Sequence, residues 1–399
     1  TLFQGGSYTV TIQNSSCAKG RVVSTARITL PGGKTSQRIV KTTVFKSLSS
    51  PTEGAAVFSG GVGNSDNIDI DFSKLKVYGN IFGNKDINVL FHSDLVVIDS
   101  TSTEEEEGKA LASERIEEFW LSEVSSTAEC AANICQTTST CGCSDTEKFQ
   151  NCAVGSCAPF ALATPKVDFD EGEYSFKARA QALQDAGKCQ FYCNGASCLC
   201  SGVLCAGANK CVLTASEFDD LLWAAGKHGT LTVNSTSNPG IVYVTGAVQI
   251  RGGRALIVNG AVVAEGSVGI GEYRSWTRDR QTHTGDSQII VNRSFATTTS
   301  GILTKSKITF GLASSFEDIS ITGVIYANDE VGFVSLPNTF NVVGGIIAKR
   351  MYFMSVFSWF NFTLDDDIIL YGLGYKIDDT VVVPQFSPVI TVEHWEEAY

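Results

Sequence analysis

The sequence predicts a mainly β fold, a right-handed parallel β-helix or β-solenoid with a few short helices and a disulfide-rich insertion. Three observations lead to this prediction: a glycine-marked motif recurs, apolar residues alternate with polar ones, and 12 of 13 cysteines fall within one segment. Apolar residues make up 43% of the 399 residues and charged residues only 18%, which excludes a disordered chain or a coiled coil. The net charge of −12 disfavours nucleic acid and anionic lipid as partners.

The recurring motif begins with Gly, continues through aliphatic residues and a small turn, and reaches Val or Ile eight residues after the Gly. Its copies lie at 79–87, 240–248, 260–268 and 323–331, with a looser one at 344–352. The second and third copies start 20 residues apart, and the last two start 21 apart. Two short strands and a glycine turn in each period of about twenty residues are typical of one coil of a β-solenoid, which buries its apolar edges by stacking on its neighbours.

Alternation supports strands over helices in the repeated segments. Residues 67–72 read Asn-Ile-Asp-Ile-Asp-Phe and residues 307–310 read Lys-Ile-Thr-Phe, which places the apolar side chains on one face with a period of two. We therefore expect an N-terminal β region with the first coil at 1–103, the β-solenoid at 229–377 and a C-terminal tail at 378–399. A helical and cysteine-rich insertion at 104–228 would separate the early coils from the late ones.

Three helices are expected inside the insertion. The first spans 108–123, where Leu111, Ile116, Phe119 and Trp120 have near-helical spacing, and the second spans about 174–185. The third starts at Thr214 and ends near Gly226, because Glu217 follows Thr214 by three residues in a capping box.

The clustered cysteines predict disulfide bonds and therefore an oxidising, extracellular location. Metal ligation is the weaker reading because the segment has neither Cys-x-x-Cys nor a histidine. The connectivity stays open, and Cys17 is left over as either a buried thiol or an intermolecular link. The predicted disulfide cysteines are Cys130, Cys135, Cys141, Cys143, Cys152, Cys157, Cys189, Cys193, Cys198, Cys200, Cys205 and Cys211.

Short motifs at both ends of the chain resemble PilX-like minor pilins of type IV pili. They are Gly-Gly-Ser-Tyr-Thr-Val-Thr-Ile at 5–12, Val-Ser-Thr-Ala at 23–26, Arg-Ile-Val-Lys at 38–41 and the Trp395-Glu-Glu ending. The motif copies at 79–87, 323–331 and 344–352 resemble solenoid coils found in the same proteins. The sequence departs from the family in lacking its long apolar N-terminal helix and in carrying the cysteine-rich insertion.

The resemblance implies an extracellular, pilus-associated structural or adhesive subunit that presents a disulfide-braced head on a rigid solenoid. Other pilus subunits or surface proteins would be its partners, with a glycan or a host or abiotic surface as a further one. Membrane contact would occur only through an N-terminal helix outside this sequence. An alternative is a self-assembling filament subunit that is joined by exchange of a terminal strand.

Carboxylates support another alternative, a carbohydrate-active β-helix enzyme such as a polysaccharide lyase or hydrolase. Asp66, Asp69 and Asp71 form one acidic cluster, and residues 365–367 form another. Hard oxygen ligands of this kind suit calcium, although their outward position also follows from the inward alternation of Ile and Phe. Otherwise no cofactor is expected. The four histidines lie outside known catalytic motifs, so no catalytic residue is predicted.

Two further sets of residues are candidates for glycan chemistry. Arg274, Trp276, Arg278 and Arg280 concentrate cations around an aromatic ring, which suits stacking on a sugar or pairing with an acidic glycan. A polar loop at a coil edge would give the same composition. Asn14, Asn234, Asn292 and Asn361 stand in sequons for N-glycosylation.

We expect the 12 clustered cysteines to resist alkylation in the native, unreduced protein and to react after reduction under denaturing conditions. Mass spectrometry of iodoacetamide-treated samples counts the modified thiols in each state. Free thiols throughout the segment in the native protein would contradict the prediction.

Overall fold

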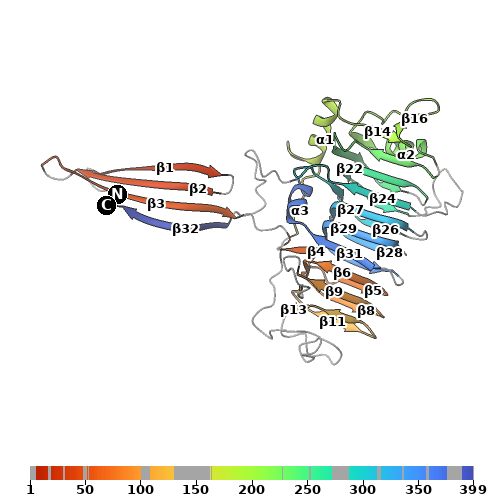
Figure 1. Cartoon of the computed structure of the whole chain (residues 1–399), viewed down its shortest axis with the longest axis horizontal. Helices are drawn as coiled ribbons and strands as arrows, with labels where there is room; N and C mark the ends of the chain where they lie inside the picture. Colours follow the sequence, from red (N-terminus) through yellow and green to blue (C-terminus); the bar gives the residue numbers. More distant parts are fainter. Residues whose placement is uncertain are drawn as a thin grey trace. The chain divides into compact units, whose positions relative to one another are not determined.

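The computed structural model is mainly β and divides into two compact units, which are described separately (Figure 1). Unit 1 comprises residues 1–53 and 375–399, and unit 2 comprises residues 54–374. The structure describes residues 6–16, 19–29, 32–47, 52, 54–99, 108–129, 162, 164–226, 228–250, 253–271, 287–311, 316–334, 337–355, 359–374 and 389–398.

Unit 1 contains one antiparallel sheet in the order β1-β2-β3-β32. Its strands are β1 (Gly6–Ser16), β2 (Lys19–Thr29), β3 (Thr35–Ser47) and β32 (Val389–Ala398). Gly32 and Gly33 have φ of 92° and 77° in the turn between β2 and β3, a backbone region that glycine enters at little cost. The final residues, expected as a tail, therefore include a strand that pairs with β3, so the two ends of the chain share one sheet.

Unit 2 is built from two large sheets whose strands pair in parallel from one repeat to the next (Figure 1). The 8-stranded sheet has the order β11 (Ile116–Phe119), β8 (Ile87–Leu90), β5 (Ile68–Asp71), β30 (Arg350–Met354), β28 (Glu330–Val334), β26 (Ile308–Phe310), β23 (Val268–Ile270) and β21 (Val248–Ile250).

The second sheet of unit 2 has 18 strands in the described residues. They are β4 (Ala55–Ser59), β6 (Lys74–Tyr78), β7 (Asn80–Gly83), β9 (Asp94–Ile98), β10 (Lys109–Ala112), β12 (Glu123–Ser125), β13 (Thr127–Glu129), β14 (Phe191–Cys193), β15 (Ala196–Ser197), β18 (Val212–Thr214), β19 (Thr230–Val233), β20 (Gly240–Thr245), β22 (Ala255–Ala264), β24 (Ser287–Asn292), β25 (Gly301–Thr304), β27 (Phe316–Ala327), β29 (Pro337–Ala348) and β31 (Trp359–Leu364).

The glycines that mark the sequence motif stack on one another. Gly240 pairs with Gly260, and Gly323 pairs with Gly344. Gly260 has φ of 122°, and a Cβ there would lie 2.0 Å from the carbonyl oxygen of Gly240. A side chain at this bend would therefore separate the two strands, which explains why the repeat needs glycine.

The order of the repeats differs from the sequence-based expectation. We expected early coils, an insertion and then late coils, but β4, β5 and β6 pair with β29, β30 and β31. The first repeat therefore lies on the last one, and the early strands continue the stack where the late ones end. Residues 54 and 374 both belong to the middle of this stack, while its two ends are formed by β11 and by β21 in the 8-stranded sheet.

Identical or similar side chains form continuous columns through the core. One column of the 8-stranded sheet is aliphatic apart from one methionine, and each member is at most 1% exposed. It consists of Val248, Val268, Ile308, Val331, Met351, Ile68, Ile87 and Ile116. In the next column Phe333 stacks on Phe310 and Phe353, with ring centroids 4.7 Å and 4.8 Å apart. Parallel pairing in register produces these columns, because equivalent positions of neighbouring repeats face each other.

Two of the three expected helices are confirmed. α1 (Phe176–Asp185) begins at Ser175, and α2 (Ala215–Ala224) begins with the Thr214–Glu217 capping box. The helix expected at 108–123 is wrong, because that segment forms β10, β11 and β12. Parallel pairing with β7, β8 and β9 overrides its helical spacing. A short helix that was not expected, α3 (Asp366–Gly372), contacts β27 and β29.

We expect Phe333→Ala to lower the free energy of unfolding by about 3–5 kcal/mol, because it leaves a cavity in the middle of the phenylalanine column. Urea unfolding of the oxidised protein measures this change. Phe295→Ala is the control, since Phe295 is 55% exposed, and it should change stability by less than about 0.5 kcal/mol. Equal effects of the two substitutions would contradict the packing described above.

Candidate functional site

Three disulfides brace residues 189–211, which we call the cystine module. They join Cys189 to Cys211, Cys193 to Cys198 and Cys200 to Cys205, with Cα atoms 5.4, 4.9 and 4.8 Å apart. The six cysteines of this group thus pair among themselves, which spacing alone left open. Cys17 and the group from Cys130 to Cys157 lie outside the described residues.

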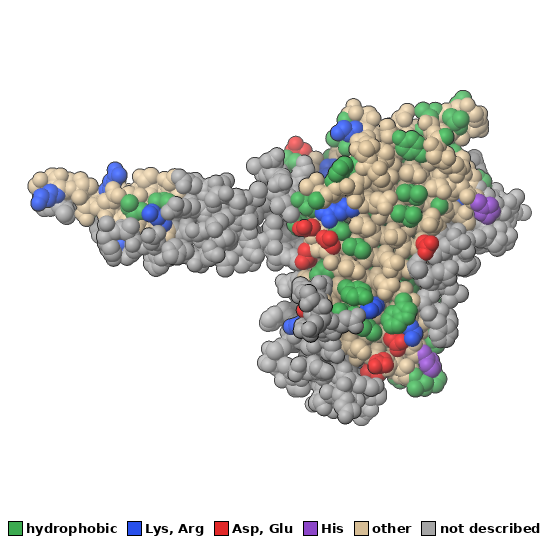
Figure 2. Space-filling model, in the orientation of Figure 1, with side chains coloured by type: hydrophobic (Ala, Val, Ile, Leu, Met, Phe, Trp, Pro, Cys, Tyr) green, Lys and Arg blue, Asp and Glu red, His purple; other side chains and the backbone are tan. Residues whose placement is uncertain are grey.

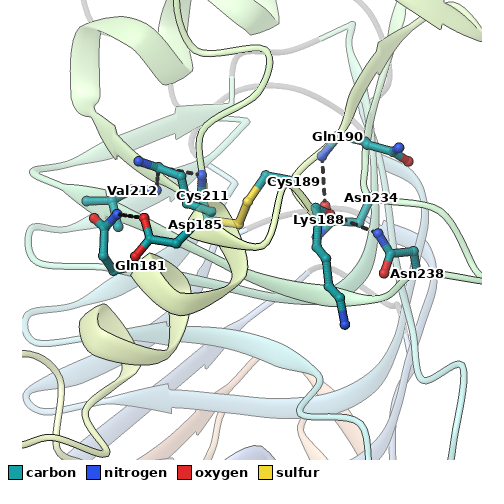
Figure 3. Close-up of a disulfide and its surroundings, with 10 residues drawn as sticks. Gln181, Asp185, Lys188, Cys189, Gln190, Cys211, Val212, Asn234 and Asn238 are labelled. Atoms are coloured by element: carbon teal, nitrogen blue, oxygen red, sulfur yellow. Dashed lines mark hydrogen bonds between the residues drawn. A yellow bond between two sulfur atoms is a disulfide. The ribbon is translucent and has the colours of Figure 1, made fainter.

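The Cys189–Cys211 disulfide ties the segment after α1 to the strand that precedes α2 (Figure 3). The side-chain oxygen of Gln184 in α1 accepts hydrogen bonds from the backbone N–H groups of Cys211 and Val212, at 3.0 and 3.1 Å. On the other side of the disulfide, Asn238 donates to the carbonyl oxygen of Lys188 at 3.0 Å. The disulfide is therefore held by hydrogen bonds on both sides.

Helix α2 adds a second brace to the module. Lys210 donates a hydrogen bond to Glu217, and Glu217 also accepts from the backbone N–H of Thr214 at 2.9 Å. The hydrogen bond from Lys210 is the main cause that holds the pKa of Glu217 below its usual value. The ionised carboxylate at the first turn of α2 fixes the start of the helix against the module.

The hairpin of β16 (Leu199–Cys200) and β17 (Val203–Leu204) exposes apolar side chains. Leu199, Val203 and Leu204 are 55%, 67% and 46% exposed, and Leu199 faces Leu204 across the hairpin. Ser201 and Gly202 both have positive φ in the two-residue turn, and the Cys200–Cys205 disulfide closes the hairpin. The module can therefore present a small apolar surface with little loss of conformational entropy on contact.

The acidic cluster of the sequence analysis is spread over separate local structures. A side-chain oxygen of Asp66 accepts from the N–H of Gly63 at 2.7 Å, whereas Asp69 accepts from the amide of Asn88 at 2.7 Å on the neighbouring strand. Asp365 accepts from the N–H of Ile368 at 2.8 Å as the N-cap of α3. Within the described ranges, no three His, Cys, Asp or Glu side chains gather as a group that could hold a metal ion.

Burial raises the pKa of Asp69 above its usual value, and the negative charge of Asp86 raises it further. The hydrogen bond from Asn88 and the charge of Arg350 act in the opposite direction. Burial and the charge of Asp69 also raise the pKa of Asp71. Ionised Asp69 is therefore electrostatically unfavourable in the folded protein at neutral pH.

Asparagines of the sequons form ladders between strands. Asn292 donates to the side-chain oxygen of Asn259 at 3.1 Å, and Asn259 donates to the carbonyl oxygen of Asn234 at 2.9 Å. Asn361 donates to Asn341 at 2.9 Å in a second ladder. Asn234 is only 1% exposed, so a glycan on its side chain does not fit the folded structure. Asn292 and Asn361 thus pair with asparagines on neighbouring strands, which was not expected from the sequence.

Residues 274–280, the proposed cationic glycan site, lie outside the described part of the chain. The side chain of Asn14 also lies there. Among the helices that the structure describes, none combines the length and apolar character required to span a membrane.

We expect loss of the Cys189–Cys211 disulfide to destabilise the protein more than loss of Cys200–Cys205. The first closes a separation of 22 residues and the second a separation of 5, so loop entropy predicts losses of about 3 and about 2 kcal/mol. The two double Cys→Ala variants are compared by urea unfolding without reductant. The reverse order would show that native contacts, and not loop closure, dominate.

We expect Asp69→Asn to stabilise the protein at pH 7 and to have a smaller effect near pH 4. The raised pKa means that the folded state still holds a proton that the unfolded state releases near pH 3.8. Stability therefore falls as the pH rises from 3.8 through the pKa of the folded state. Asparagine removes this loss and still accepts the hydrogen bond from Asn88. Urea unfolding at both pH values tests the difference.

Asp94→Asn is the matched control for this experiment, because it removes a 2.7 Å ion pair with Lys74. It should not stabilise the protein at pH 7. Stabilisation by Asp94→Asn alone, or none by Asp69→Asn, would contradict the assignment.

No protein-family model matches the sequence, and no curated protein matches it. Among solved structures, the chain is similar to the crystal structure of the competence-associated pilin ComZ from Thermus thermophilus. The two share 14% sequence identity with a TM-score of 0.26, and the match covers 98% of this chain and 84% of that chain.

Proposed function

We propose that this protein is a non-enzymatic, extracellular adhesive subunit that is similar to PilX-like minor pilins. The observation that carries this proposal is the cystine module, where two disulfides brace a hairpin whose three aliphatic side chains face solvent. Disulfides persist in oxidising compartments, which supports a location at the cell surface or on a pilus. The sequence motifs at both ends of the chain support the relation to pilins.

We further propose that unit 2 is a right-handed β-solenoid that acts as a stiff spacer. Parallel pairing between motif copies that start 20 or 21 residues apart supports the solenoid. Parallel crossovers within one sheet are right-handed in about 98% of cases, which supports the handedness. Hydrogen bonds between every pair of neighbouring repeats would resist deformation along the stack.

Several sequence predictions belong to the same proposal. The cysteines from Cys130 to Cys157 would form further disulfides in the insertion at 104–228. Arg274, Trp276, Arg278 and Arg280 would provide a glycan contact, and other pilus subunits would be the assembly partners. These assignments rest on the sequence.

Adhesion of protein-coated beads to hydrophobic and glass surfaces under flow tests the role of the hairpin. We expect Leu199→Ser, Val203→Ser and Leu204→Ser together to reduce retention on the hydrophobic surface several-fold, because they remove the apolar contact. Val62→Ser is the control, since Val62 is 69% exposed elsewhere in unit 2. Unchanged retention of the triple variant would overturn the proposal that the hairpin is adhesive.

The relation to pilins has a separate test in the gene region that precedes the codon for Thr1. An apolar helix behind a prepilin cleavage site supports assembly into a pilus. A plain secretory signal would overturn that part of the proposal and leave the adhesive function to the flow experiment.

A further inference from the structure

Exposed aromatic side chains form a column at one corner of unit 2, beyond the ends of β5, β8 and β11. Phe72 is 43% exposed and Trp120 is 63% exposed, and the half-buried Phe91 lies between them. Leu121 extends the column and is 72% exposed. Figure 2 shows a histidine and hydrophobic side chains at the lower right of unit 2, on the side where β5 and β8 are labelled in Figure 1. We call Phe72, Phe91, His92, Trp120 and Leu121 the aromatic corner.

The rings of the aromatic corner contact one another from repeat to repeat. Phe72 stacks on Phe91 with a centroid distance of 5.6 Å and an interplanar angle of 13°. Trp120 meets Phe91 edge-on at 5.8 Å and lies 6.1 Å from the ring of His92. Neighbouring strands are about 4.8 Å apart, so the column presents rings at the spacing of the repeats.

The backbone of the aromatic corner is in a conformation that large side chains normally avoid. Phe72, Phe91 and Trp120 have φ of 48°, 43° and 46°, and His92 and Leu121 have φ of 59° and 58°. Bulky residues rarely adopt such values, and strain of this kind concentrates at functional sites.

Other turns of unit 2 place glycine at positive φ, where glycine is not strained. After β23 and β26, at the same end of the 8-stranded sheet, the residues with positive φ are Gly271 and Gly311. The turn therefore does not require an aromatic residue. Glycine serves the fold at the equivalent end of other strands, so we take the large rings at three successive repeats as a sign of an additional role.

Hydrogen bonds join the turns of the aromatic corner to one another. The N–H groups of Phe91 and His92 donate to the carbonyl oxygens of Phe119 and Trp120, each at 3.1 Å. Beneath the rings, the N–H of Ser73 donates to the hydroxyl of Ser93 at 3.1 Å, and the N–H of Ser93 donates to Ser122 at 3.3 Å. These contacts fix the turns to one another, which lowers the entropy lost when a ligand stacks on the rings.

The charges beside the corner favour an uncharged ligand with hydrogen-bonding groups. Asp71 precedes Phe72, and the adjacent strand positions are Lys74, Asp94 and Glu123. Lys74 is paired with Asp94 at 2.7 Å, so the surroundings supply acceptors without an unpaired cluster of cations. Phosphate polymers and acidic glycans are repelled by such a surface and by the net charge of −12.

We propose that the aromatic corner binds an uncharged polysaccharide, whose sugar rings pack against the exposed surfaces of Phe72, Trp120 and Leu121. The corner extends across three successive repeats, so a linear polymer can contact all three at once. The nearby carboxylates accept hydrogen bonds from sugar hydroxyls. This inference rests on the proposed adhesive function in one respect, because it names the partner of such a subunit.

Binding of the purified, oxidised protein to microcrystalline cellulose and to chitin tests the proposal, together with tryptophan fluorescence titrations against cellohexaose and chitohexaose. The test variant combines Phe72→Asn and Trp120→Asn. Asparagine suits the backbone, since Asn194 and Asn234 of this chain have φ of 52° and 60°. Tyr174→Asn is the matched control, because Tyr174 is 48% exposed and lies outside the corner.

We expect the wild-type protein and the control to bind at least one of the two polymers and its hexasaccharide, and the double variant to lose affinity about tenfold or more. Its circular dichroism and unfolding midpoint should stay close to those of the wild type. The proposal is overturned if neither polysaccharide binds, or if the folded double variant binds as tightly as the wild type. Binding to duplex DNA or to phosphatidylcholine vesicles in place of the polysaccharides also overturns it.

The hairpin variant with serine at 199, 203 and 204 separates this inference from the adhesive function. It should bind the polysaccharides normally while losing retention on the hydrophobic surface. If retention depends on the hairpin and no polysaccharide binds, the glycan inference fails alone. If the polysaccharides bind and the hairpin does not affect retention, the adhesive role of the hairpin fails alone.

Discussion

Parallel pairing in register between neighbouring repeats is the interaction on which unit 2 depends. Each strand obtains its hydrogen bonds from the repeats on either side, and the same register places like side chains in contact. Phe333 illustrates the result, since it lies between Phe310 and Phe353 and is fully buried. The motif glycines serve the same register, because the carbonyl of Gly240 occupies the space that a Cβ of Gly260 would need.

A stack of strands has two ends, and the chain of unit 2 must pass from the β11 end to the β21 end. The chain of unit 2 starts and finishes in the middle of the stack, where β5 pairs with β30. Residues 54 and 374, the first and last of unit 2, therefore both belong to the middle of the stack, and within unit 1 β3 pairs with β32. At one end of the 8-stranded sheet, α2 packs against β21. A helix that covers the edge of a sheet limits unwanted strand pairing there. The cystine module also contacts α2, through β14 and β16.

Turns at the same end of the 8-stranded sheet place either glycine or aromatic residues at positive φ. Glycine forms the turns after β23 and β26, whereas aromatic residues form those after β5, β8 and β11. A bulky residue with positive φ is strained, and the exposed rings of the aromatic corner contribute little to the core. In the hairpin of the cystine module, a disulfide likewise holds exposed aliphatic side chains in place. These are the two surfaces to which we assign recognition.

The repeat length, strand alternation, the second and third helices and the cysteine group were predictable from the sequence, because each is a local pattern with a local physical cause. The Thr214–Glu217 capping box, for example, needs only four consecutive residues. The candidate sites were less predictable. The acidic cluster consists of residues with separate hydrogen-bond partners, and the sequon asparagines 234, 292 and 361 form ladders with partners 20 to 33 residues away.

Tertiary structure alone decided which repeats are neighbours, how the cysteines of the module pair and what residues 108–123 become. Alternation states which side chains face inward, but any two repeats with the same pattern can pair in parallel, so the order depends on how the chain connects them. Residues 108–123 have the spacing of a helix, yet β7, β8 and β9 offer them unpaired backbone groups. The strand conformation outweighs the local preference, because it also buries Ala110, Ile116 and Val124 in the core.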